Sequence, residues 1–206
     1  MTAGKRIFDF VLALCLGVVL LPVLALVAGL LLVAEGRPVF YISERMRTPT
    51  RSFGLIKLRT MRPAPPGTQE GVTGGDKAGR MSRLQRFLRR TRADEIPQLW
   101  NVIRGDMSLV GPRPPLRLYV EAFPELYARV LKNRPGITGL ASLRYHAVEE
   151  RLLAACRTAE ETDTVYRRRC VPRKAALDLI YQRRRNLCWD MILVLQTAAR
   201  PFRHRG

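Results

Sequence analysis

Residues 10–34 read FVLALCLGVVLLPVLALVAGLLLVA, an apolar stretch that contains no charged side chain. A straight helix of this length is about 37 Å long, enough to cross a hydrocarbon core of roughly 30 Å. A cleaved signal peptide has a shorter apolar region and a small-residue cleavage site, so that alternative fits less well. We therefore expect residues 1–36 to form a membrane-embedded helix.

Pro22 lies in the middle of this stretch and raises the question of topology. A proline inside a helix removes one hydrogen bond and collides with the preceding turn, which costs about 3 kcal/mol or kinks the helix. Lys5 and Arg6 precede the stretch, and Arg37 and Arg45 follow it. Basic flanks favour the cytoplasmic side, so both ends prefer the same face. A re-entrant helix broken at Pro22 satisfies both ends, but these features leave a kinked single span open.

The composition points to an anionic partner. The chain has 206 residues, with 36 Lys and Arg against 17 Asp and Glu and a net charge of +19. Its hydrophobic fraction of 47% is ample for a folded core, so the charge does not indicate disorder. Nucleic acid, anionic lipid and a phosphorylated substrate all remain open as partners. Four cysteines without CxxC spacing fit a reduced environment and argue against structural zinc.

The remainder, residues 37–206, is predicted to be a mainly α-helical body with a small β-hairpin, an α+β fold. The β-branched and aromatic runs at 37–44 and 51–61 are separated by a turn at Pro49, which is typical of a hairpin. Residues 62–80 are rich in Gly and Pro and are expected to form a mobile loop.

Two helices are expected next. Residues 82–93 carry apolar side chains at helical spacing, with arginines on the other face. Asp94 could cap a short second helix at 95–104, and Gly105 suits its C-terminal end. Three residues are expected to bury one face of that second helix: Leu99, Trp100 and Ile103.

The C-terminal third is predicted to be helical and basic. Its last segment combines arginines with Trp189, Met191, Ile192 and Leu195. This mixture suits amphipathic helices at a membrane interface, with tryptophan at the headgroup level. An ordinary core-packing helix with a solvated face fits the same residues.

The adjacent carboxylates Asp94 and Glu95 are the first chemical candidates. Acids at a helix start often stabilise it by about 1 kcal/mol, and spacing alone favours this structural role. Beside Arg89, Arg90 and Arg92, however, Asp94 is expected to stay ionised. An ionised, positioned carboxylate can attack phosphorus or hold a divalent ion.

Basic residues supply the second set of candidates. Arg113 lies between two prolines in GPRP, which limits its backbone freedom and presents a planar donor fork suited to phosphate. Lys57 and Arg59 follow in KLRTM. Taken singly, each could be an ordinary exposed turn or strand residue.

Taken in order, these motifs carry a resemblance. The chain contains KRIFDF, the Pro-interrupted apolar stretch, FGLIKLRTM, RMSRLQRFLRRTRADEIPQLWNVIRGDMSLVGPRP and NRPGITGLA. Over about residues 5–200 it closely resembles the small monotopic phosphoglycosyl transferases, bacterial sugar transferases that start glycan assembly on polyprenyl phosphate. The long motif around Asp94 is specific.

The resemblance implies a reaction and a location. Such enzymes move a phospho-sugar from a nucleoside-diphosphate sugar, usually a UDP-sugar, to polyprenyl (undecaprenyl) phosphate and release UMP. They carry a re-entrant helix and act at the cytoplasmic face of the bacterial inner membrane. Bacterial membrane lipids are therefore expected partners, nucleic acid is not, and a homodimer is left open.

The resemblance also assigns roles to residues. Asp94 matches the nucleophile that forms a covalent phospho-sugar intermediate, and Glu95 matches the acid that supports it together with Mg²⁺. Both are therefore candidate metal ligands. Arg89 and Arg113 match phosphate-binding arginines, and Lys57 and Arg59 are further phosphate-binding candidates.

The sequence departs from the commonest family pattern at several points. Leu21 stands where many relatives have serine before the membrane proline, RADE replaces SLDE, and SLRYHAVEE follows PGITGLA. The last departure leaves the sugar open. A membrane-tethered nucleic-acid-binding protein or a non-catalytic scaffold is the alternative, but neither explains the intact Asp-Glu pair and PRP motif.

Overall fold

The structure is a computed structural model that describes residues 2–62, 71–72 and 79–203. It confirms a mostly helical chain with a small antiparallel hairpin and one long apolar N-terminal helix. The helices are α1 (Ala3–Glu35), α2 (Arg83–Thr91), α3 (Gln98–Arg104), α4 (Arg117–Ala122), α5 (Pro124–Val130), α6 (Leu140–Arg144), α7 (His146–Ala154), α8 (Ala159–Val165), α9 (Val171–Arg184) and α10 (Leu187–Arg203). The strands are β1 (Phe40–Met46), β2 (Ser52–Leu58), β3 (Ser108–Val110) and β4 (Gly136–Thr138). Most of the predicted loop at 62–80 lies outside the described residues.

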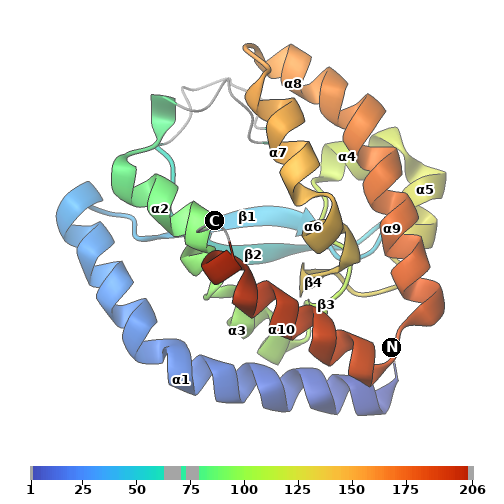
Figure 1. The fold of residues 1–206 in the computed structure, drawn as a ribbon, viewed down its shortest axis with the longest axis horizontal. Coiled ribbons are helices and arrows are strands. Elements are labelled where there is room, and N and C mark those ends of the chain that lie inside the picture. Colours follow the sequence, from blue (N-terminus) through green and yellow to red (C-terminus); the bar gives the residue numbers. More distant parts are fainter. Residues whose placement is uncertain (1, 63–70, 73–78, 204–206) are drawn as a thin grey trace.

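Helix α1 is long and apolar enough to cross a membrane. The Thr2 side chain caps its first turn, and Gly36 ends it with a positive φ of 70°. Figure 1 shows α1 (blue) changing direction partway along its length, and Pro22 lies inside the helix. A proline in a helix interior is a sufficient cause for such a bend.

Both halves of α1 pack against the body of the molecule, the described residues from Arg37 onward. In the N-terminal half, Ala13 is fully buried in a cluster formed with α3, β3 and α10. In the C-terminal half, Leu31 is buried with Leu58 of the hairpin and Leu88 of α2. The rest of α1 exposes large apolar side chains.

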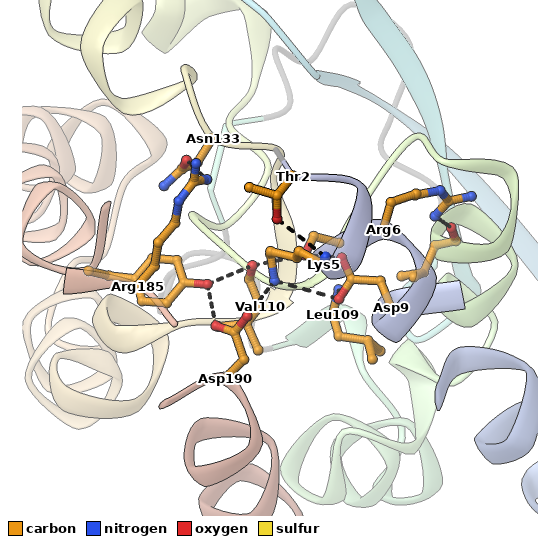
Figure 2. Close-up of polar contacts among 12 residues, drawn as sticks. Thr2, Lys5, Arg6, Asp9, Leu109, Val110, Asn133, Arg185 and Asp190 are labelled. Carbon is orange, nitrogen blue, oxygen red and sulfur yellow. Dashed lines mark hydrogen bonds and ion pairs between the residues drawn. The ribbon is translucent and has the colours of Figure 1, made fainter. Parts of the chain in front are cut away.

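A buried polar network also holds the N-terminal half of α1 in place (Figure 2). The Lys5 ammonium lies 2.7 Å from an Asp190 carboxylate oxygen on α10 and 3.6 Å from Asp9 on its own helix. Asp9 in turn accepts a 2.7 Å hydrogen bond from the Ser108 hydroxyl at the start of β3. The Tyr181 hydroxyl donates to Asp190. Because removing one partner leaves a buried charge uncompensated, this network fixes α1 relative to β3 and α10.

A buried polar side chain of α3 binds the backbone of the hairpin. Asn101 is fully buried, accepts a 3.0 Å hydrogen bond from the Ile56 amide and donates a 2.8 Å hydrogen bond to the Gly54 carbonyl. The Asn101 side chain therefore supplies β2 with the hydrogen-bond acceptor and donor that the backbone of an additional strand would supply. Helix α3 is thereby fixed relative to the hairpin.

Strands β3 and β4 form a short parallel pair that the sequence did not predict. The NRPGITGL segment runs directly into β4. Three glycines allow the backbones to meet: a Cβ atom on Gly111 would lie 2.2 Å from the Arg134 carbonyl oxygen, and Cβ atoms on Gly136 and Gly139 would collide with Gly111 itself. The GPRP and PGITG segments therefore form one structural unit.

One expected burial is wrong. Trp100 is 55% exposed because it lies on the side of α3 opposite the buried residues Leu99, Asn101 and Val102. On α2, Phe87 is 52% exposed, whereas Leu88 is buried. Helix α10 has features of both a core-packing helix and an interfacial helix. It buries Leu193 and exposes a group of apolar side chains: Leu187, Met191, Ile192 and Leu195.

Candidate active site

The carboxylate pair lies in a single 3-10 turn, Ala93–Glu95, between α2 and α3. The prediction that Asp94 caps the following helix is wrong. Helix α3 starts at Gln98 and has no side-chain cap. A cap at Asp94 would use an amide about three residues later, and Pro97 at that position has no N–H group. The chain enters the turn through Arg92, whose φ of 58° is unusual for a residue other than glycine.

The two neighbouring carboxylates have different surroundings. Asp94 is 6% exposed and Glu95 is 9% exposed, so both are buried. The Glu95 carboxylate accepts a 2.6 Å hydrogen bond from Arg113 and a 3.3 Å hydrogen bond from Arg92, one on each oxygen. Within the described part of the chain, the Asp94 carboxylate accepts no hydrogen bond. Glu95 is therefore held in place by two arginines, whereas the Asp94 carboxylate can interact with a ligand.

Their proton affinities differ accordingly. Burial alone would raise the pKa of Glu95, but the charges of Arg113 and Arg92 outweigh it and lower that pKa. Burial and the neighbouring Glu95 charge raise the pKa of Asp94, although Arg89, Lys57 and Arg113 oppose the change. The expectation that nearby arginines simply hold Asp94 ionised therefore omitted the larger effects of burial and of Glu95.

Four cations form a group at this turn: Lys57, Arg89 and Arg113 act on Asp94, and Arg45 lies near Lys57. Burial and then the charges of the three arginines lower the pKa of Lys57 to about 8. Such mutual repulsion between cations is relieved when an anion binds among them.

Arg45 is a site residue that the sequence analysis missed. The register of the hairpin pairs Tyr41 with Lys57, and residues two apart on a strand share a face, so Tyr41, Arg45 and Lys57 face the same side. Burial, followed by the charge of Arg113, lowers the pKa of Arg45 to about 10. Tyr41, Ser43 and Arg45 alternate with other residues along β1, which indicates that they share one face of the strand. Only the hairpin register shows that this face also carries Lys57.

Arg113 is presented by the parallel strand pair. The Gly111 amide donates a 2.8 Å hydrogen bond to the Thr138 carbonyl, and the Gly136 amide donates a 2.8 Å hydrogen bond to the Pro112 carbonyl. These bonds fix the backbone immediately before Arg113. The Arg113 side chain is still 42% exposed, so it can contact a ligand while it holds Glu95.

Arg89 reaches the site from the last turn of α2. Its guanidinium lies 3.1 Å from the Met61 sulfur and 3.4 Å from the Met81 sulfur. Its positive charge also acts on Asp94 and opposes the rise in the pKa of that carboxyl, so Arg89 lies close to the dyad. Its contact with phosphate stays a prediction.

Arg59, another phosphate-binding candidate, binds main-chain carbonyls at the end of α1. Its guanidinium donates hydrogen bonds of 2.8 Å to the Glu35 carbonyl and 2.9 Å to the Gly36 carbonyl. These groups lie at the C-terminal end of α1, where carbonyls lack partners within the helix. Arg59 therefore fastens the end of α1 to β2 and is not grouped with the cations around the dyad.

The residues that could hold a divalent cation are the dyad carboxylates. The described residues contain no group of three or more His, Cys, Asp or Glu side chains suited to a metal. Mg²⁺ commonly binds through one or two carboxylates together with substrate phosphates. The unoccupied oxygens of Asp94 fit that pattern, whereas both Glu95 oxygens already accept from arginines.

Comparison with known proteins identifies the family to which this site belongs. The profile described as "Bacterial sugar transferase" matches residues 1–204. The chain belongs to the bacterial sugar transferase family. This sugar transferase is 36% identical over 199 residues to the UDP-glucose:undecaprenyl-phosphate glucose-1-phosphate transferase of Caulobacter vibrioides, covering 94% of this chain and 67% of the relative.

Other relatives of this sugar transferase carry different names. A putative undecaprenyl-phosphate N-acetylgalactosaminyl 1-phosphate transferase of Bacillus subtilis is 38% identical over 70% of this chain and 79% of its own length. A UDP-galactose-lipid carrier transferase of Erwinia amylovora is 35% identical over 66% of this chain, but the match spans only 31% of that protein. Three different sugars thus occur in the names of these three relatives.

Proposed function

We propose that this protein is a membrane-bound phosphoglycosyl transferase that moves a phospho-sugar from a UDP-sugar to undecaprenyl phosphate and releases UMP. Family membership supports the reaction class. The names of the relatives support the lipid acceptor and a UDP-sugar donor. The identity of the sugar is left to assay, because the relatives differ in this respect.

The observation that carries the proposal is the contrast between Asp94 and Glu95. Glu95 is fixed by Arg113 and Arg92, whereas Asp94 is buried, accepts no hydrogen bond from a described residue, and faces the charges of Arg89 and Lys57. A carboxylate that only stabilised the fold would be expected to use its hydrogen-bonding capacity. Asp94 is therefore the proposed nucleophile.

The proposed reaction has two displacements at phosphorus. In the first, an Asp94 oxygen attacks the phosphorus that bears the sugar, and the bond to the UMP oxygen breaks, so that UMP leaves with the electron pair. In the second, a phosphate oxygen of the acceptor attacks the same phosphorus and the bond to Asp94 breaks. The aspartate carboxylate is regenerated, and no oxidant or reductant is needed.

The cations around the dyad suit this chemistry. Donor and acceptor are both anionic, and the surrounding cations would neutralise their phosphate oxygens as charge develops. Arg113 additionally holds Glu95 ionised beside Asp94. Mg²⁺, held by Asp94 together with donor phosphates, would supply further charge neutralisation. One small site can thereby serve a soluble donor and a lipid acceptor in turn.

The proposed topology is re-entrant, with both ends of α1 on the cytoplasmic side of the bacterial inner membrane. Lys5 near one end is paired with Asp190 of the body, and Arg59 of the body binds carbonyls at the other end. A helix that crossed the bilayer would separate its ends by roughly 30 Å of hydrocarbon. Attachment of both ends to one body, together with the bend and Pro22, favours entry and return.

Replacement of Asp94 by asparagine tests the proposed function. Since Asp94 caps no helix and is buried, Asp94→Asn should keep the melting temperature at or slightly above that of the wild type. UMP release from a panel of UDP-sugars, with undecaprenyl phosphate in detergent, should fall by several orders of magnitude. Asp163→Asn is the matched control and should stay active, because it removes a partly exposed carboxylate of α8 whose partner is Arg167.

Mass spectrometry provides an independent measurement. Wild-type protein given the donor alone should gain the mass of the phospho-sugar on the peptide that contains Asp94, and undecaprenyl phosphate should remove it. Near-normal turnover by a folded Asp94→Asn variant would exclude Asp94 as the nucleophile.

A further inference from the structure

A second cationic region lies at the N-terminal end of α1, away from the dyad. A cavity of about 520 Å³ opens between the first turn of α1, the turn that joins β1 to β2, and the segment after α5. None of its lining residues is acidic, and none belongs to the dyad or to the four cations around it. Its polar lining residues are Thr2, Thr48, Arg6, Arg47, Lys132 and Arg134.

Arg134 is the cation with an unsatisfied donor in this cavity. Its Nη1 atom is buried and has no hydrogen-bond partner among the residues that the structure describes. Burial, followed by the charges of Arg47 and Arg6, lowers the pKa of Arg134 although Asp9 and Asp106 oppose this change. The surroundings of Arg134 are therefore rich in uncompensated positive charge. An anion placed here would supply both an acceptor and a counter-charge.

The other cations differ in how far they are already engaged. Arg6 donates to the Val102 and Ile103 carbonyls at the C-terminal end of α3, at 2.6 and 2.7 Å, and points away from the Lys5 network (Figure 2). Arg47 and Lys132 form no ion pair with any described residue. Arg47, Lys132 and Arg134 are therefore the charges available to a ligand, and Arg6 supports the wall of the cavity.

The position of the cavity indicates the source of such an anion. Directly after Arg6, α1 exposes Ile7 by 64% and Phe10 by 40%. The Arg6 guanidinium lies 5.9 Å from the centre of the Phe10 ring. A cationic cavity thus adjoins the start of an exposed apolar helix. This arrangement matches the boundary of a bilayer, where phosphate groups lie next to hydrocarbon.

We propose that this cavity binds the phosphate group of a membrane phospholipid and so holds the N-terminal end of α1 at the headgroup level. Arginine forks match pairs of phosphate oxygens, and an ammonium adds charge without strict geometry. The ligand chemistry is a phosphate ester, and it stands on the cavity alone. Its assignment to a lipid rests on the proposal that α1 lies in a membrane.

The test measures lipid retention by the full chain in a neutral detergent. Native mass spectrometry would follow the titration of phosphatidylglycerol into the wild type and into a variant carrying Arg47→Gln, Lys132→Gln and Arg134→Gln. We expect one retained lipid in the wild type and at least a tenfold weaker affinity in the variant. A control with three exposed arginines replaced elsewhere (Arg157→Gln, Arg168→Gln and Arg173→Gln) should bind as the wild type does.

Three further measurements distinguish the possible outcomes. Lys132→Gln alone, at an exposed side chain, should still weaken binding if the triple variant fails to fold. Inorganic phosphate, titrated by calorimetry, should bind far more weakly than the lipid; equal binding with the same loss in the variant would overturn the lipid assignment. Unchanged phosphatidylglycerol affinity in a folded triple variant would overturn the site. UMP release by the triple variant in detergent should be unaffected, which separates this proposal from that for the dyad.

Discussion

The Arg113–Glu95 ion pair gives a prediction whose magnitude follows from the structure. The guanidinium nitrogen lies 2.6 Å from a carboxylate whose side chain is only 10% exposed. Removing one partner of a fully buried pair costs about 3–5 kcal/mol. Here Arg113 is 42% exposed and Arg92 stays at 3.3 Å, so we expect Arg113→Ala to cost about 1–3 kcal/mol.

A double-mutant cycle isolates that interaction. In a Glu95→Gln background no carboxylate is left uncompensated, so the same Arg113→Ala change should cost well under about 1 kcal/mol. Thermal unfolding in detergent measures the difference. For a chain of this size, 1–3 kcal/mol corresponds to a decrease of roughly 3–9 °C in Tm for Arg113→Ala alone. The double variant should recover most of this decrease.

The cycle has a matched control and a second measurement. Arg117 and Glu44 are also 2.6 Å apart, but both side chains are about half exposed, so Arg117→Ala should leave Tm unchanged. UMP release should stay low in the double variant, because Arg113, the proposed phosphate-binding arginine, is still missing. Equal destabilisation by Arg113→Ala with and without the Glu95 charge would refute the ion-pair reasoning.

Two remaining predictions concern topology and pH. If α1 is re-entrant, single cysteines at residues 2 and 206 should both resist labelling in intact cells. Pro22→Ala should expose the first in part of the population, and labelling of residue 2 in the wild type would restore a spanning helix. Asp178 on α9 is 8% exposed, and burial raises its pKa to about 7 although Lys174 opposes this. Because a raised folded-state pKa favours the protonated form, the stability that it provides below about pH 4 is lost as pH rises through about 7. Asp178→Asn should therefore increase Tm relative to the wild type at pH 8 but not at pH 4, and a pH-independent difference would contradict the burial effect.

The sequence was sufficient where a local pattern determines structure. Features that depend on neighbouring residues are found as predicted: the long apolar helix with its internal proline, the hairpin formed by the two β-branched runs, and the end of α3 at Gly105. The adjacent acids and the Pro-flanked arginine were also recognisable as candidates. What the sequence could not provide was the difference between Asp94 and Glu95, because that difference depends on where Arg113 lies in space.

Long-range contacts account for the errors. Strands β3 and β4 have only three residues each, too short for a periodic signal, and they pair because glycines distant in the sequence permit close backbone contact. Arg59 was a phosphate-binding candidate because it follows Lys57 closely, and that role stays a prediction. The sequence could not show that its guanidinium binds carbonyls of α1, which only the folded structure brings near. Arg45 was missed for the converse reason, since its relation to Lys57 follows from the hairpin register.

These contacts also connect the membrane helix to the chemistry. Asp9 of α1 binds the Ser108 hydroxyl at the start of β3, and the backbone that leaves β3 carries Gly111 and then Arg113. Arg113 in turn holds Glu95 beside Asp94. Since a buried side-chain contact and backbone hydrogen bonds link α1 to the backbone just before Arg113, we expect a displacement of α1 to alter the position of Arg113 and, through it, that of Glu95.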